Sequence, residues 1–337
     1  MKYKVLGNTG LKVSELCLGT MTFGGKGFFS VMGNLGQDSV DQLMKKSVDA
    51  GVNFIDTANV YSEGVSEELT GKAIRNLGLK RDELIIATKV RGAMGPGPND
   101  SGLSRKHIIQ QVEASLKRLN TDYIDLYQIH NYDPLTPISE TIDTLDDLVR
   151  SGKVRYTGAS NMPAWQLMKA VDYAKYERKT RFISMQSYYS LAGRDLEREM
   201  VPLLLDQKIG LMIWSPLAAG LLSGKYNRNG ESREGGRLTS FESFPVDRQR
   251  AFNILDILRP MAEEKNASLA QLALAWLLYQ PAVTSVIVGA NKIEQLEDNL
   301  KSSDIVFSEE ELKKLDEVSQ LPLEYPGWLE PMQQDRR

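Results

Sequence analysis

The chain has 337 residues, 42% of them hydrophobic and 25% charged, which is enough apolar material for a large core and argues against disorder of the whole chain. Its 41 basic and 44 acidic residues are spread along the sequence without a basic block, so we expect no nucleic-acid partner. Neither a signal peptide nor a run of about 18 apolar residues is present, so we expect a soluble, cytoplasmic protein that does not span a membrane. One cysteine and two histidines predict neither an internal disulfide nor a catalytic metal site.

The predicted elements begin with a β-hairpin, which we expect to plug one end of the fold. Its arms are Lys2–Val5 and Leu11–Val13, joined by the turn Gly7–Gly10. Eight short apolar runs follow as predicted strands: Leu16–Leu18, Asn53–Ile55, Leu84–Thr88, Ile124–Ile129, Val154–Thr157, Phe182–Met185, Gly210–Ile213 and Thr284–Val288. Amphipathic segments with helical spacing lie between them: Val40–Asp49, Arg105–Leu119, Ile138–Arg150, Ala164–Ala174, Leu196–Asp206 and Leu269–Tyr279. This alternation predicts an α/β protein, a closed (β/α)₈ barrel of the TIM type in which residues 1–337 form one domain with a C-terminal tail of low regularity.

The main alternative fold is an open, doubly wound sheet. Such a sheet normally carries a Gly-x-Gly-x-x-Gly turn after its first strand to hold a dinucleotide, and no such turn is present here. The stretch Gly19–Lys26 also misses the phosphate-binding P-loop pattern, so we interpret it as a flexible loop after the first barrel strand. The polar stretch Asn227–Asp247 is long for a compact domain, and we expect it to be a lid or binding loop.

Four polar residues mark the ends of consecutive predicted strands. Asp56 ends the second barrel strand, Tyr61 follows five residues later, Lys89 ends the third strand and His130 ends the fourth. Taken singly, each has an ordinary structural explanation, such as a cap, a packed ring or a solvated charge. Because the βα loops of a barrel all lie at one face, the set is expected to meet in a single site.

The chemistry of this set suits proton donation to a carbonyl oxygen. Tyrosine has a pKa near 10, and a nearby ammonium group such as that of Lys89 stabilises the tyrosinate that remains after donation. Asp56 is suited to hold Lys89, and His130 is suited to orient a carbonyl oxygen against the Tyr61 hydroxyl. The set therefore predicts a general acid with stabilisation of the developing oxyanion.

These residues stand in segments that resemble the aldo-keto reductase family. The resembling segments are Asn53–Tyr61, Thr88–Lys89 and Asp125–His130, and the likeness extends through Gly152–Asn161 and Trp214–Lys225. The resemblance covers about residues 3–320. It implies a barrel that binds NADPH without a Rossmann domain and reduces an aldehyde or ketone, with Tyr61 as the acid assisted by Asp56, Lys89 and His130.

The resemblance also implies positions that bind the cofactor. Ser160, Asn161 and Gln186 match residues that hold the nicotinamide carboxamide, and Trp214 matches an aromatic residue that stacks on the nicotinamide ring. Positions around the pyrophosphate are Ser215, Leu217, Gly220, Leu222, Gly224 and Lys225. Positions around the adenosine 2′-phosphate and adenine are Gly289, Asn291, Lys292, Gln295, Asp298 and Asn299. Many members carry arginine where this chain has Gln295, so we expect NADPH to be preferred over NADH only modestly, with Lys292 as the critical charge.

The substrate pocket is expected to involve Phe23, Tyr61, Arg91 and His130, together with the loops Met94–Asn99, Asn131–Pro134 and Tyr325–Trp328. The partner is then a small carbonyl compound whose identity stays open, as does the oligomeric state. Two other functions remain possible from the sequence. One is a regulatory subunit like the potassium-channel β-subunits that resemble the same family, and the other is an aldolase-type barrel in which Lys89 forms a Schiff base.

Overall fold

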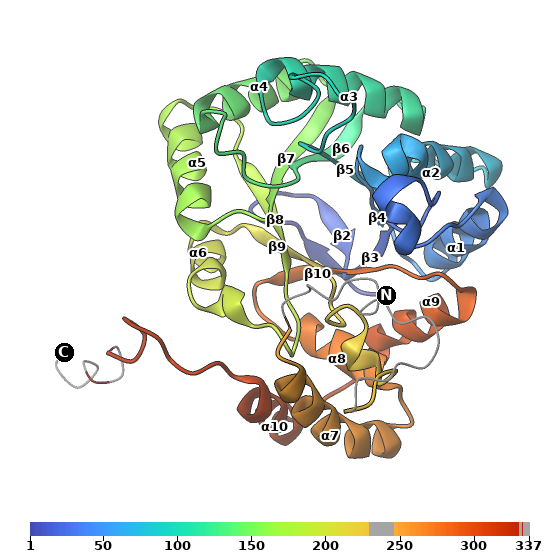
Figure 1. Cartoon of the computed structure of the whole chain (residues 1–337), viewed down its shortest axis with the longest axis vertical. Helices are drawn as coiled ribbons and strands as arrows, with labels where there is room; N and C mark the ends of the chain where they lie inside the picture. The colour runs from blue at the N-terminus through green and yellow to red at the C-terminus, as the bar shows by residue number, and fades with distance from the viewer. Residues whose placement is uncertain (229–245, 330–331, 333–337) are drawn as a thin grey trace.

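A closed barrel of eight parallel strands forms the centre of the protein (Figure 1). The computed structural model describes residues 1–228, 246–329 and 332. The strands pair in sequence order, and the last strand closes the ring by pairing with the first. They are β3 (Leu16–Gly19), β4 (Phe54–Asp56), β5 (Ile85–Val90), β6 (Ile124–Ile129), β7 (Val154–Ser160), β8 (Phe182–Tyr188), β9 (Gly210–Trp214) and β10 (Val283–Val288). The predicted (β/α)₈ barrel is confirmed, and β6 has the bounds expected from the sequence.

Helices surround the barrel on all sides and cover the outer face of its strands (Figure 1). They are α1 (Gln37–Asp49), α2 (Val65–Asn76), α3 (Arg105–Leu119), α4 (Ile138–Arg150), α5 (Ala164–Tyr176), α6 (Met200–Gln207), α7 (Arg248–Lys265), α8 (Leu269–Leu278), α9 (Ile293–Leu300) and α10 (Glu309–Ser319). The α4 helix illustrates why these segments are helical. Its residues Ile142, Leu145 and Leu148 recur at helical spacing and are all buried against the barrel.

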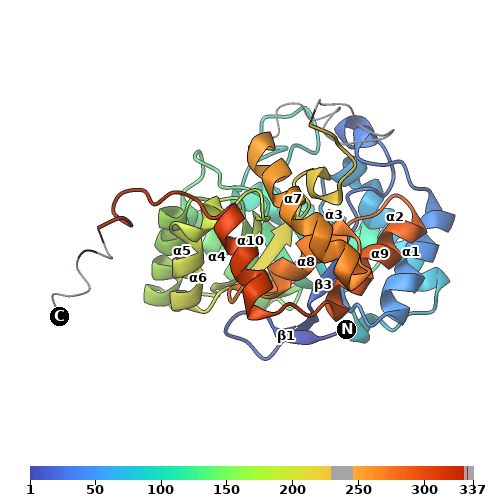
Figure 2. The same ribbon diagram turned by 90° about the horizontal axis from the view of Figure 1, so that it is seen from below.

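The N-terminal hairpin closes one end of the barrel. Its antiparallel strands are β1 (Tyr3–Val5) and β2 (Lys12–Ser14), and β1 lies at the lower end of the molecule in Figure 2. Leu6 and Val13 are fully buried in a cluster with side chains of the barrel interior, including that of Cys17. A Cβ atom at Gly7 would overlap the carbonyl oxygen of Ile183, so the hairpin turn approaches β8 closely. The hairpin plug is therefore confirmed, and the open end of the barrel is the opposite one.

The C-terminal region departs from the expectation of low regularity, because it contains α10. This helix begins with a capping box, in which Ser308 accepts from the backbone of Glu311 and Glu311 in turn accepts from the backbone of Ser308. After α10 the chain leaves the body of the protein sideways (Figures 1 and 2). Tyr325 and Trp328 are 75% and 44% exposed there, so the structure does not support their expected part in the pocket.

Two further observations concern the limits of the described chain. Of the predicted loop Asn227–Asp247, residues 229–245 lie outside the described residues. Within the ranges that the structure describes, no helix is both long and apolar enough to cross a membrane.

Candidate active site

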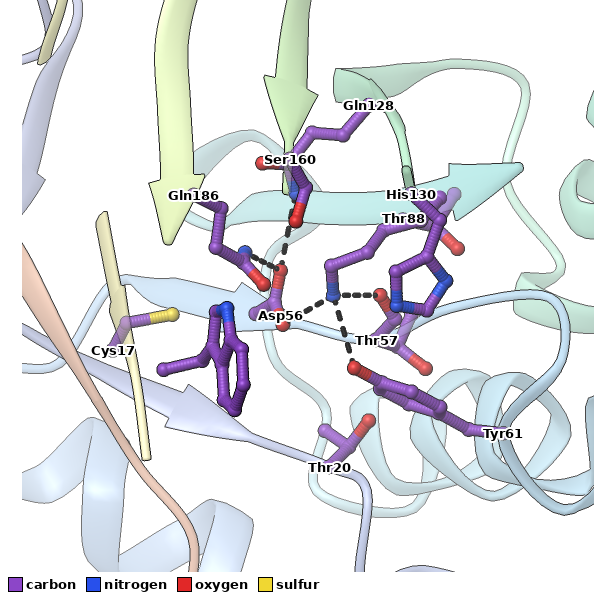
Figure 3. Close-up of polar contacts among 12 residues, drawn as sticks. Cys17, Thr20, Asp56, Thr57, Tyr61, Thr88, Gln128, His130, Ser160 and Gln186 are labelled. Atoms are coloured by element: carbon purple, nitrogen blue, oxygen red, sulfur yellow. Dashed lines mark hydrogen bonds and ion pairs between the residues drawn. The ribbon is translucent and has the colours of Figure 1, made fainter. Parts of the chain in front are cut away.

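An ion pair and a tyrosine occupy the barrel interior at the open ends of β4 and β5 (Figure 3). The Lys89 ammonium donates to Asp56 Oδ2 at 2.5 Å, to the carbonyl oxygen of Thr57 at 2.8 Å and to the Tyr61 hydroxyl at 3.3 Å. Lys89 is fully buried and Tyr61 is 8% exposed. The structure thus brings together three of the four residues predicted at the strand ends.

These contacts decide the charges of the site. Burial works against a charged Lys89, but Asp56 and then Tyr61 outweigh it and raise the pKa of the lysine. Burial raises the pKa of the Tyr61 phenol, whereas the charge of Lys89 acts to lower it. Lys89 therefore remains an ammonium group that offsets part of the effect of burial on Tyr61.

His130 is the fourth predicted residue, and its ring lies beside that of Tyr61 (Figure 3). The two ring centroids are 5.7 Å apart, with the planes at 74°. Burial, followed by the positive charges of Lys89 and Arg91, lowers the pKa of His130 to about 3. The imidazole is consequently neutral near pH 7 and keeps one N–H group that can donate to an oxygen atom.

Asp56 has two further partners, one of which sequence reasoning missed. Gln186 donates to Asp56 Oδ1 at 2.9 Å, and Gln128 donates to the same oxygen at 3.2 Å. Gln186 was expected to hold the nicotinamide, whereas Gln128 was not singled out. Its signal was present in the sequence, because Gln128 precedes His130 by two residues on β6 and therefore faces the same side of the sheet.

The turn that carries Tyr61 is held by unusual backbone geometry. Ser62 and Glu63 have positive φ angles of 50° and 58°, and Gly64 follows with 95° before α2 begins. The Ser62 hydroxyl donates to the carbonyl oxygen of Phe23, and Ser66 donates to that of Thr20. These bonds tie the turn to the loop after β3 and fix the position of Tyr61.

The residues expected around the nicotinamide lie next to this site. Ser160 ends β7 and is fully buried, and Asn161 follows it with a φ of 48°. The Trp214 indole N–H donates to Asn161 Oδ1 at 2.9 Å, and Asn161 Nδ2 donates to Ser160 Oγ at 2.9 Å. Trp214 is partly exposed at the end of β9, and its ring lies against that of Tyr188, with the centroids 5.4 Å apart.

The segment after β9 is a series of tight turns. Five of its residues have φ between 50° and 91°, and they are Ser215, Ala218, Ala219, Gly220 and Gly224. The turns are closed by hydrogen bonds within the segment: the N–H groups of Ala218, Gly220 and Gly224 donate to its own carbonyl oxygens, and that of Ala219 donates to Ser215 Oγ. Lys225 is exposed at the end of the segment, whereas Leu222 is fully buried and contributes to the core instead.

In the segment after β10, only some of the residues expected to bind the cofactor are exposed. Gly289, Asn291 and Lys292 are exposed before α9, and Gln295 accepts from the backbone N–H of Asn291 at 3.1 Å. Farther along α9 the side chains have structural partners. Asp298 accepts from Ser268 and Gln271, both at 2.6 Å, and Asn299 is 8% exposed. At the start of α9, the Asn291 amide donates to the carbonyl oxygen of Met32 at 3.1 Å, so Lys292 is the exposed positive charge there.

Comparisons with known proteins agree with this architecture. The model of the aldo/keto reductase family matches residues 15–320. Versiconal hemiacetal acetate reductase of Aspergillus parasiticus is 35% identical, covering 97% of this chain and 99% of the relative. An uncharacterized oxidoreductase of Bacillus subtilis is 37% identical, covering 94% of this chain and 96% of the relative. A protein of Arabidopsis thaliana named a probable voltage-gated potassium channel subunit beta is 38% identical, covering 91% of this chain and 92% of the relative. The chain belongs to the aldo/keto reductase family of oxidoreductases.

Proposed function

We propose that the protein is an NADPH-dependent reductase of aldehydes or ketones in which Tyr61 donates the proton to the carbonyl oxygen. The observation that carries this proposal is the hydrogen bond between Lys89 and Tyr61. A lysine ammonium has only donors, so the Tyr61 oxygen accepts in this bond and its own proton stays available. In the reverse direction, the tyrosinate held by Lys89 would accept a proton from an alcohol.

The other groups of the site support the same reaction. When bound, reduced nicotinamide supplies the hydride. Neutral His130 can donate a hydrogen bond to the substrate oxygen and orient it towards Tyr61. Ser160 and Asn161 offer polar groups for a carboxamide, and the exposed Lys225 offers a positive charge for a pyrophosphate. Gln186 donates one N–H to Asp56, so its proposed contact to the carboxamide uses its oxygen atom or its second N–H.

The two alternative functions fit less well. A Schiff-base lysine needs a depressed pKa, whereas the pKa of Lys89 is raised by its pairing with Asp56. A regulatory subunit without turnover has no need for an acid, an ammonium group and a neutral imidazole in contact at one site. Three relatives carry a channel-subunit name, however, so turnover is the property to measure.

The test is the variant Tyr61→Phe, assayed by loss of NADPH absorbance with a panel of aldehydes and ketones. We expect the wild-type protein to reduce at least one of these compounds. The turnover rate of the variant should be at least about 100-fold lower, since general acid catalysis contributes about 10² to 10⁴ in rate. Affinity for NADPH, measured by fluorescence titration, should change little, because the hydroxyl is proposed to contact the substrate. A variant that keeps more than about a tenth of wild-type turnover would remove Tyr61 from the role of acid.

A further inference from the structure

A second cation, Arg91, stands at the mouth of the barrel beside the proposed acid. It follows β5 directly, two residues after Lys89, and Val90 pairs in register with Ile129. The backbone N–H of His130 donates to the carbonyl oxygen of Val90 at 2.9 Å, so Arg91 and His130 continue from neighbouring strands. A Cβ atom on the next residue, Gly92, would lie 2.9 Å from Val60, the residue before Tyr61. The backbone at Arg91 is therefore packed close to the turn that carries the acid.

The backbone at Arg91 is held in an unfavourable conformation. Its φ of 149° is one that residues with side chains rarely adopt, and its carbonyl oxygen accepts from the N–H of Gly102 at 2.9 Å. The adjacent N–H of Leu103 donates to Asp133 at 2.8 Å, which fastens the base of this loop to the segment after β6. Strained residues that are held by their surroundings cluster at functional sites.

The guanidinium of Arg91 has no protein partner of opposite charge. Arg91 is partly buried, its Nε atom is shielded from solvent, and this atom has no hydrogen-bond partner. None of the ion pairs formed within residues 1–228, 246–329 and 332 includes Arg91. Asp133 is near enough for the charge of Arg91 to act to lower its pKa, but its carboxylate accepts from other donors. These donors are the N–H groups of Leu103 and Leu135 and the hydroxyl of Thr136.

The neighbouring charges leave Arg91 as the uncompensated cation at this mouth. The charge of Lys89 is paired with that of Asp56 at 2.5 Å, and His130 is neutral. A guanidinium keeps its charge at every physiological pH and presents its N–H groups in a planar fork. The group that matches this fork in both charge and shape is a carboxylate.

We propose that Arg91 selects carbonyl substrates that carry a carboxylate, and that its guanidinium binds this group while the carbonyl oxygen lies at Tyr61 and His130. This inference rests on the proposed function, since it names the class of substrate for the same site. Arg91 is then a specificity-determining residue. The favoured substrates are aldehydes or ketones of organic acids, and neutral carbonyl compounds of the same size react less efficiently.

The experiment compares two substrates of one shape, 4-formylbenzoate and its neutral methyl ester. We measure kcat/KM for both with wild-type protein, Arg91→Met, Arg91→Lys and the control Arg105→Met, whose exposed arginine pairs with Asp147. We expect wild type to favour the carboxylate by about 10-fold to 100-fold, the range of a hydrogen-bonded charge contact. Arg91→Met should abolish this preference, Arg91→Lys should keep part of it, and Arg105→Met should keep all of it.

A direct binding measurement separates this inference from the proposed function. Calorimetric titration with 4-(hydroxymethyl)benzoate, in the presence of oxidised cofactor, should show at least about 10-fold weaker binding to Arg91→Met than to wild type. Equal kcat/KM for the two substrates in wild type overturns the carboxylate proposal and leaves the reductase intact. If neither substrate is reduced, the proposed function fails for this pair, and the titration still decides whether Arg91 binds a carboxylate.

Discussion

The charge of Lys89 governs how readily Tyr61 can part with its proton. The phenol is buried, and burial raises its pKa because a tyrosinate is poorly solvated there. Lys89 acts in the opposite direction through both its charge and its hydrogen bond to the phenol oxygen. The acid strength of Tyr61 is therefore a balance of two effects, and substitution of Lys89 shifts that balance.

We expect Lys89→Met to lower the rate of carbonyl reduction and to change its dependence on pH. Without the ammonium group the pKa of Tyr61 rises further, so the loss of activity at high pH moves to a higher pH. The measurement is kcat/KM for reduction against pH, with Lys80→Met as a control because Lys80 is exposed and pairs with Glu83 at the surface. A high-pH limb that stays in place or moves down would refute this account. The double variant Lys89→Met/Asp56→Asn tests whether the unpaired Asp56 carboxylate adds to the effect.

At the scale of elements, a buried carboxylate on α2 joins this helix to α3 and to the strand that carries Lys89. Glu67 is fully buried and accepts from Thr88 Oγ1 at 2.5 Å and from Arg118 Nε at 2.6 Å. Glu67 lies on α2, Thr88 on β5 and Arg118 on α3, so one carboxylate joins three elements. Thr88 precedes Lys89, and this link therefore supports the strand from its outer side.

Removal of this carboxylate should destabilise the fold strongly. Glu67→Ala leaves the Arg118 guanidinium in a largely buried place without its partner, and we expect a loss of roughly 3–5 kcal/mol in the free energy of unfolding. Urea unfolding followed by circular dichroism measures it. The matched control is Asp49→Ala, which breaks the exposed pair with Lys45 and should cost less than about 1 kcal/mol. A cost for Glu67→Ala as small as that of the control would mean that the pair is not a structural link.

The start of α9 is the element expected to distinguish NADPH from NADH. Lys292 is exposed at the N-cap position and takes part in none of the ion pairs among the described residues, so its charge is available to a 2′-phosphate together with the N-terminus of the helix. We expect Lys292→Met to reduce the ratio of NADPH to NADH affinities by about tenfold, the size of one charged hydrogen bond. Fluorescence titration measures both affinities, and Lys301→Met at the other end of α9 is the control. An unchanged ratio would show that the phosphate contact is wrongly assigned.

At the scale of the whole molecule, the two histidines make stability depend on pH. Burial lowers the pKa of both His107 and His130, that of His130 to about 3, whereas histidine in an unfolded chain titrates near 6.5. Below pH 6.5 the unfolded chain therefore binds protons that the folded protein does not bind. The contribution of the two neutral histidines to the stability of the fold is present above pH 6.5 and is lost as the pH falls towards 3.

We expect the melting temperature to decrease between pH 7 and pH 4.5, and His130→Gln to reduce this decrease. Each histidine contributes at most about 1.4 kcal/mol per pH unit in this window. Differential scanning calorimetry of the wild type and the variant measures the slope. Between pH 7 and pH 9 the two proteins should have parallel slopes, which serves as the internal control. Equal slopes below pH 6.5 would contradict a depressed pKa of His130.

The order of the elements was predictable from the sequence because it depends on local patterns. The run Ile124–Ile129 is apolar and bounded by polar residues, and α3 and α4 have the bounds that their helical spacing predicts. The placement of Asp56, Lys89 and His130 at strand ends also followed from the sequence, since parallel strands of a barrel present these ends at one face.

Only the tertiary structure decided how these groups are paired. Asp56 accepts from Gln128 and Gln186, which lie 72 and 130 residues away along the chain, and no local pattern specifies such contacts. Local patterns also do not specify that the Trp214 indole donates to Asn161 or that Asp298 accepts from Ser268. Nor do they specify that Arg91 Nε is left without a hydrogen-bond partner. The physical reason is that periodicity reports which face of an element is buried. Hydrogen bonds, ion pairs and pKa shifts depend on distances that exist only once the barrel has closed.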